Sequence, residues 1–138
     1  MTVRLTNSVL RAGVRFLTVV EVVVGLVATL APRVFYDYVP WVNLMPPFSE
    51  HLMRDYGAMN LSLALVFVVA AITMERRMVQ IALGAYLLFA IPHLMFHVTH
   101  LENFTMGATV GQTIALTLAV LLPIALLILS RQHRDDRG

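Results

Sequence analysis

Long apolar stretches alternate with short charged or proline-rich segments along the whole chain. The four apolar stretches cover residues 10–31, 51–74, 78–99 and 106–129. Each is long enough to cross the hydrocarbon core of a bilayer, about 30 Å thick, as an α-helix. The pattern predicts an all-α fold: a four-helix transmembrane bundle that forms a single integral membrane domain over residues 1–138.

The composition indicates a protein that lies in a lipid bilayer. Hydrophobic residues make up 59% of the chain and charged residues 13%, whereas soluble domains are about half apolar and a quarter charged. The chain has no cysteine, which excludes disulfides, thiolate metal sites and cysteine nucleophiles. All ten basic residues are arginines at segment ends, so we expect the lipid bilayer and no nucleic acid as a partner.

The arginines also predict the orientation of the bundle. By the positive-inside rule, the side with most basic residues is cytoplasmic. Only Arg33 and Arg54 fall on the opposite side from the other eight. Both termini and the tail, residues 130–138, are therefore expected in the cytoplasm. The eight are Arg4, Arg11, Arg15, Arg76, Arg77, Arg131, Arg134 and Arg137.

The connection between the first two spans, residues 32–50, is the only long one. Its prolines exclude a long helix, and its aromatic side chains are of the kind that settle at the boundary between membrane and water. We expect an outer aromatic loop that acts as an anchor, with a lid over a site as the alternative. The prolines and aromatic residues are Pro32, Pro40, Pro46, Pro47, Phe35, Tyr36, Tyr38, Trp41 and Phe48.

The concentrated chemistry of the chain lies in the third span. His93, His97 and His100 are spaced by four and three residues, which places three imidazoles on one face of a helix, together with Tyr86. Facing imidazoles on adjacent turns can reach one metal ion. The pattern is not that of a zinc protease, because position 94 is leucine where the motif has its glutamate.

The predicted orientation brings further polar groups to the same outer half. Glu21 lies about 15 Å below the outer end of the first span at 1.5 Å per residue, and Asn60 lies at a similar depth in the second. An ionisable group inside a span rarely faces lipid, so Glu21 is a functional candidate. We expect one pocket, with Glu21 and Asn60 as its floor, Asp55 and His93 as its walls, and His51, His97 and His100 at its rim.

Three interpretations of this pocket stay open. The first is a transition-metal site, for which the candidate ligands are His93, His97, His100, Glu21 and Asp55. The second is a haem held between His51 and a histidine of the third span, His93 or His97. The third is a polar cluster that only fixes helix packing. No pattern in the chain identifies a reaction.

A short motif marks the start of the fourth span. Gly107 and Gly111 form a GxxxG pattern, which is typical of close helix packing. We expect it to pack within the subunit, and Gln112 beside it to hydrogen-bond across helices.

The layout resembles that of the small DoxX-like and DUF4345-like bacterial membrane proteins. The segments EHLMRDYGAMNL and FAIPHLMFHVTH are similar in character to theirs, and the lysine-free, arginine-rich composition is similar to that of actinobacterial members. The resemblance implies a place in the inner membrane of a bacterial cell and a redox role with a quinone as substrate, in a larger membrane complex. The GxxxG motif also allows a homo-oligomer. The alternative function is that of a non-catalytic membrane subunit or a small-molecule-binding accessory.

Overall fold

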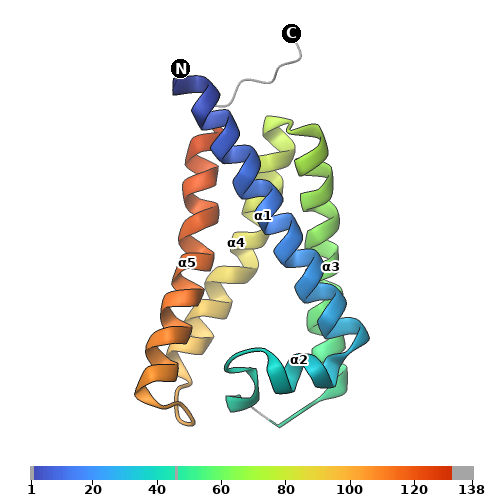
Figure 1. Ribbon diagram of the computed structural model, residues 1–138, viewed down its shortest axis with the longest axis vertical. Coiled ribbons are helices and arrows are strands. Elements are labelled where there is room, and N and C mark those ends of the chain that lie inside the picture. The colour runs from blue at the N-terminus through green and yellow to red at the C-terminus, as the bar shows by residue number, and fades with distance from the viewer. Residues whose placement is uncertain (1, 46, 132–138) are drawn as a thin grey trace.

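The computed structural model describes residues 2–45 and 47–131, and the side chains of residues 7–45 and 47–131. This part of the chain is helical and contains no strand. Four long helices run between two ends, and α2 crosses one of them (Figure 1). The helices are α1 (Thr2–Leu30), α2 (Pro32–Tyr38), the 3-10 helix η1 (Val42–Leu44), α3 (Glu50–Thr73), α4 (Arg76–Thr99) and α5 (Met106–Ser130).

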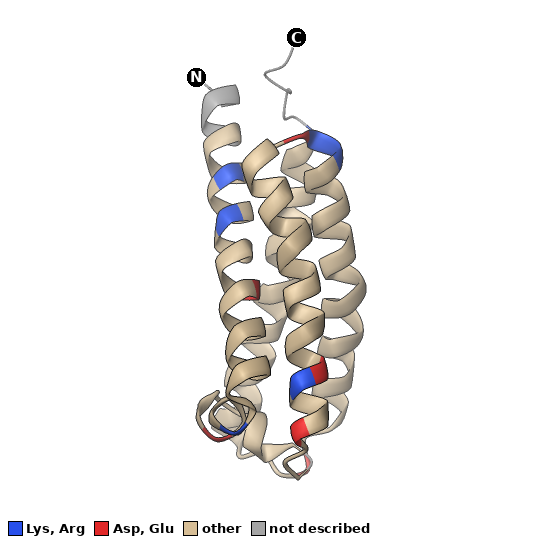
Figure 2. Ribbon diagram, turned by 90° about the vertical axis from the view of Figure 1, so that its right-hand side faces the viewer, with Lys and Arg blue, Asp and Glu red and all other residues tan. Residues whose placement is uncertain are grey.

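The two ends of the bundle differ. Helix α1 begins and α5 ends at the same end, which we call the terminal end (Figure 1). Helix α2 lies at the other end, which we call the loop end. The charged positions gather toward these two ends, except one acidic residue near the middle of α1, which is Glu21 (Figure 2).

The long helices face lipid with apolar side chains. Segments Asn7–Leu30, Glu50–Thr73, Arg76–Thr99 and Met106–Ser130 are long and apolar enough to cross a membrane. Large hydrophobic side chains point outward from them: Leu88 is 81% exposed, Ile72 78% and Leu65 68%. A soluble monomer does not keep so many large apolar side chains in water. The chain is a multi-pass integral membrane protein, and the expected four-helix bundle is confirmed.

The helix boundaries follow from local chemistry. Ser49 caps α3 by accepting a hydrogen bond from the Leu52 backbone nitrogen at 3.3 Å, and Thr105 caps α5 by accepting one from Ala108 at 3.3 Å. The loop of residues 32–50 contains a short helix, α2, because Pro32 stands in its first turn, where proline's missing N–H costs nothing. The prolines of this loop do exclude a long helix. Among the residues discussed above, Pro46, Arg134 and Arg137 and the side chain of Arg4 lie outside the described part.

Helices α1 and α3 approach each other backbone to backbone near the loop end. A Cβ atom at Gly57 would lie 2.6 Å from the backbone nitrogen of Thr29, and one at Gly25 would lie 2.9 Å from that of Leu61. At the terminal end, Gly13 of α1 instead lies against Leu126 of α5. Helix α1 therefore leans across the bundle, from α5 at the terminal end to α3 at the loop end (Figure 1).

The apolar core occupies the terminal half. Its buried members come from all four long helices, so this half packs tightly. Because α1 leans away from α5, the loop half is packed less closely between these two helices. The most completely buried large core residues are Leu10, Val14, Phe67, Val79, Leu83 and Leu126.

A first prediction concerns the contact between α1 and α3. We expect Gly57→Ala to lower the free energy of unfolding by about 1–3 kcal/mol, because the added methyl group overlaps backbone atoms that cannot move aside. Gly84→Ala is the matched control, since a Cβ atom there meets nothing within 4 Å. Unfolding in mixed detergent micelles measures both. Equal stability of the two variants would contradict the close contact.

Candidate functional site

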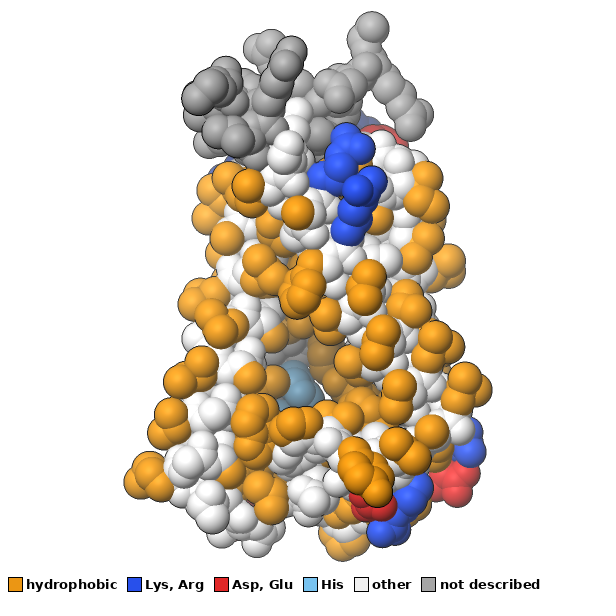
Figure 3. Space-filling model, viewed as in Figure 1, with side chains coloured by type: hydrophobic (Ala, Val, Ile, Leu, Met, Phe, Trp, Pro, Cys, Tyr) orange, Lys and Arg blue, Asp and Glu red, His pale blue; other side chains and the backbone are white. Residues whose placement is uncertain are grey.

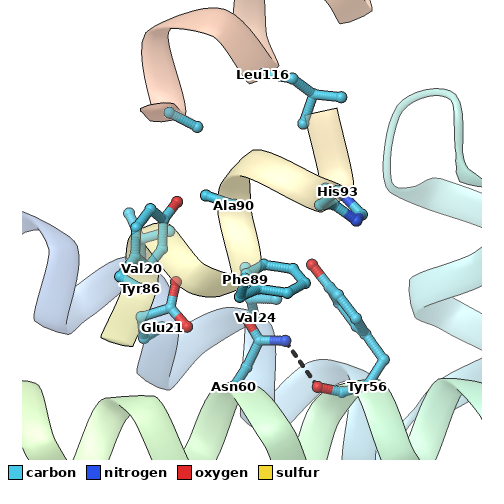
Figure 4. Close-up of a pocket in the computed structure, with 11 residues that line it drawn as sticks. Val20, Glu21, Val24, Tyr56, Asn60, Tyr86, Phe89, Ala90, His93 and Leu116 are labelled. Carbon is cyan, nitrogen blue, oxygen red and sulfur yellow. Dashed lines mark hydrogen bonds between the residues drawn. The ribbon is translucent and has the colours of Figure 1, made fainter. Parts of the chain in front are cut away.

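The loop half contains a cavity of about 100 Å³ that all four long helices line. Figure 4 shows its walls, which are mostly apolar or aromatic with a few polar groups. Pockets that bind small molecules have this character. The lining residues are Val20, Glu21 and Val24 of α1, Tyr56 and Asn60 of α3, Tyr86, Phe89, Ala90 and His93 of α4, and Leu116 and Ala119 of α5.

Glu21 belongs to the buried stripe of α1. It follows Leu10, Val14 and Leu17 at helical spacing, so the same helix face that forms the core carries its carboxyl group into the bundle. The residue is 3% exposed, and its Oε2 atom has no hydrogen-bond partner among the described residues. Figure 4 shows the carboxyl group pointing into the space between α1, α3 and α4.

Two residues of α3, one helical turn apart, line the cavity. Asn60 is 2% exposed, and its Nδ2 atom donates a hydrogen bond to the backbone oxygen of Tyr56 at 2.7 Å (Figure 4). This bond turns the amide along its own helix, so Asn60 does not hold the Glu21 carboxyl in place. The expected floor of Glu21 and Asn60 is present in the structure.

Helix α4 supplies an aromatic wall at spacings of three and four residues. The ring centroids of Tyr86 and Phe89 are 6.4 Å apart, and those of Phe89 and His93 are 4.9 Å apart. Tyr56 of α3 continues this wall, with its ring 6.1 Å from Phe89 and stacked on His93 at 6.2 Å. These separations are typical of interacting rings.

The three histidines of α4 have different surroundings. The rings of His93 and His97 are 4.4 Å apart, but only His93 lines the cavity. His97 is half-buried and its Nδ1 atom contacts the amide nitrogen of Gln112, the bond across helices that we expected of Gln112. His100 is exposed, stacks on Phe96 at 4.1 Å and ends the helix.

His51 and Asp55 do not line the cavity, and their expected places at its rim and wall are wrong. Their side chains are 87% and 63% exposed and pair with each other at 3.2 Å. The reason is helix geometry. Because Tyr56 and Asn60 of α3 face the cavity, Asp55 points about 100° away from it.

The expected metal ligands do not form one group. Among the side chains that the structure describes, no set of three or more His, Asp or Glu residues is close enough to hold a metal ion. His93 and His97 are neighbours, whereas His100 and Asp55 point elsewhere.

Sequence reasoning missed part of the wall. Tyr56 lies four residues before Asn60, so a search one helical turn from Asn60 would have found it, whereas the spacing of the third span already places Phe89 on the face of Tyr86 and His93. The sequence does not distinguish Leu116 and Ala119 from the other apolar residues of the fourth span.

The loop of residues 32–50 packs against α5 at the loop end. The ring of Trp41 lies so close to Gly111 that a Cβ atom there would be 2.9 Å from it, and Asn103 donates a hydrogen bond to the Leu44 backbone oxygen at 3.3 Å. The GxxxG motif therefore receives a loop side chain at Gly111 instead of a helix. A Cβ atom added at Gly107 would meet no atom of another described element within 4 Å.

No protein-family model, curated protein or solved structure matches this chain. The argument for function therefore rests on the cavity.

A second prediction separates a packing role of Glu21 from a ligand-binding one. We expect Glu21→Leu to leave the stability unchanged or to raise it by up to about 1–3 kcal/mol, because the substitution removes a buried oxygen without a partner. Leu83→Ala in the core should lower the stability by about 2–5 kcal/mol and calibrates the assay. Thermal unfolding of the detergent-purified variants gives both values. A Glu21→Leu variant less stable than the parent would show that the carboxyl holds helices together.

Proposed function

We propose that this chain is a membrane protein that binds a small lipid-soluble molecule in the cavity at Glu21. The observation that carries the proposal is the Oε2 atom of Glu21, which is buried, has no hydrogen-bond partner in the described part of the chain, and belongs to a residue that lines the cavity. A buried polar atom without a hydrogen bond is destabilising. Natural proteins keep such groups mainly where function needs them.

The position of the cavity supports a ligand from the membrane. Figure 3 shows a hollow in the face between α1 and α5, with a histidine side chain visible inside it. The cavity walls on these two helices are apolar: Val20 and Val24 on α1, and Leu116 and Ala119 on α5. Because this face spans the bilayer, a molecule dissolved in lipid can reach Glu21 without crossing the polar ends.

The size of the cavity favours a small head group. At about 100 Å³, it is on the order of three water molecules at about 30 Å³ each. A haem macrocycle is far larger. A transition-metal site has one observation in its favour, the neighbouring rings of His93 and His97. The membership in the DoxX-like families and the quinone-linked redox role stay predictions from resemblance.

A third prediction tests the proposal without choosing a ligand in advance. Protein extracted in polymer-bounded native membrane discs should carry one small organic molecule at close to one per chain, visible when an organic extract is analysed by mass spectrometry. Leu116→Trp fills the mouth of the cavity and should abolish this enrichment. Leu118→Trp is the matched control. Leu118 lies on the same helix but is 60% exposed and does not line the cavity, so this variant should retain the enrichment.

The same samples decide between the candidates. No enriched molecule in the parent protein, or equal enrichment in the Leu116→Trp variant, would overturn the proposal. Iron, copper or zinc at one per chain, lost in a His93→Ala/His97→Ala variant, would establish the metal site instead. An enriched quinone would support the redox role that the resemblance implies.

We also propose that the terminal end of the bundle faces the cytoplasm. Arg11, Arg15, Arg76, Arg77 and Arg131 belong to this end, whereas Arg33 and Arg54 belong to the loop end. The positive-inside rule then places the loop end, and the cavity near it, on the outer side.

A fourth prediction tests this orientation. The chain has no cysteine, so a single introduced thiol reports its own side of the membrane. A membrane-impermeant maleimide should label Glu102→Cys in intact cells and should label Glu75→Cys only after the membrane is opened; both positions are exposed. The reverse labelling pattern would contradict the orientation.

A further inference from the structure

The cavity combines a carboxyl group with several aromatic rings. Tyr56, Tyr86 and Phe89 line it together with Glu21, and neighbouring ring centroids in this set are 6.1 and 6.4 Å apart. The face of an aromatic ring carries partial negative charge and attracts a cation within about 6 Å of its centre. Three such rings beside one carboxyl group form a surface that is suited to positive charge.

Among the side chains that the structure describes, the only basic one that lines the cavity is His93. No arginine lines the cavity. Three acidic side chains of α2 and α3 at the loop end are paired within their own helix: Asp37 with Arg33, Glu50 with Arg54, and Asp55 with His51. Glu21 is in no such pair among the described residues.

A buried carboxylate is stable in a low-dielectric surrounding only if an opposite charge or several hydrogen bonds compensate it. Asn60 lines the same cavity, but the hydrogen bond of its amide nitrogen goes to the Tyr56 backbone, and the Oε2 atom of Glu21 has no hydrogen-bond partner among the described residues. His93 lines the same cavity, but its ring stacks between Phe89 and Tyr56 as part of the wall. The site therefore lacks a positive charge that compensates the carboxylate, and a cationic ligand can supply that charge.

We infer that the ligand of this cavity is an organic ammonium cation with a hydrocarbon tail, its head group held by Glu21 and the rings of Tyr56, Tyr86 and Phe89. The inference rests on the proposed function and names its ligand class. Quaternary and alkylated ammonium groups are the ligands that aromatic cages recognise in proteins.

Size and surroundings fit this class. A trimethylammonium group is of the size that a space of about 100 Å³ accepts. The hollow between α1 and α5 leaves a path along which a tail can extend from the head group into the lipid (Figure 3). Val24 and Leu116 stand at the cavity on these two helices and offer the tail apolar contacts.

A fifth prediction follows. Protein in lipid nanodiscs should bind radiolabelled octyltrimethylammonium saturably at one per chain, after subtraction of the uptake by empty nanodiscs. Glu21→Gln keeps the shape of the side chain but removes its charge, and should weaken binding by about tenfold or more. Phe89→Leu should weaken it about two- to fivefold, because it removes one ring face. Phe96→Leu is the matched control on α4, since Phe96 does not line the cavity, and should bind like the parent.

A neutral isostere separates charge from shape. In this competitor a carbon atom replaces the ammonium nitrogen, so that a tert-butyl group takes the place of the trimethylammonium group. We expect it to compete at least about tenfold less well than unlabelled octyltrimethylammonium. Equal competition, or unchanged affinity in Glu21→Gln, would overturn the inference.

The inference and the proposed function fail in different ways. If an enriched organic molecule is found in native discs but octyltrimethylammonium does not bind, the cavity binds a ligand of another class and only the inference falls. If native discs yield no enriched organic molecule, and neither octyltrimethylammonium nor its neutral isostere binds, the inference and the proposed function are both wrong. Saturable binding that the Leu116→Trp variant abolishes and the Leu118→Trp variant retains would support both.

Discussion

The arrangement of this bundle depends on keeping one carboxyl group out of lipid. Glu21 stands within the membrane-crossing part of α1, and an ionisable group in such a place costs about 3 kcal/mol if it faces hydrocarbon. The buried stripe of α1 places Glu21 on the inward face, so the carboxyl group must lie among the other three long helices. They surround it with Asn60, Tyr86 and apolar side chains, yet leave its Oε2 atom without a partner. Burial keeps the carboxyl group away from lipid. Its Oε2 atom, which has no hydrogen-bond partner among the described residues, remains available to a ligand.

The lean of α1 explains why space remains there. Gly13 lets α1 approach Leu126 of α5 at the terminal end, and Gly25 and Gly57 let α1 approach α3 at the loop end. Between these contacts α1 crosses the bundle, so the terminal half closes into an apolar core and the loop half opens between α1 and α5 (Figures 1 and 3). The contact of Trp41 with Gly111 joins the loop of residues 32–50 to α5 at the loop end. Tight packing at one end and a cavity at the other are consequences of the same helix crossing.

Much of this fold follows from the sequence, because the length of an apolar stretch and the thickness of a bilayer determine a spanning helix almost alone. The meeting of Glu21, Asn60 and His93 could also be predicted, since residue counts give depth along a helix. The rotation of each helix about its own axis was harder to predict. His51 and Asp55 have the expected level but point outward, because the apolar stripe of α3 gives little sign of which face its first turns bury. The lean of α1 depends on where glycines of different helices meet, and a single sequence does not contain that pairing.

The most direct test is chemical modification of Glu21 from within the membrane. Diisopropylcarbodiimide is small, dissolves in lipid and adds to carboxyl groups that lie in apolar surroundings. If Glu21 is unpaired and reachable through the hollow between α1 and α5, peptide mapping should find a stable adduct on Glu21, none at this position in a Glu21→Gln variant, and slower modification when octyltrimethylammonium is bound. A folded protein that carries no organic molecule by mass spectrometry and whose Glu21 still stays unmodified would contradict the account, because its carboxyl group would then be sealed or already bound by the protein itself.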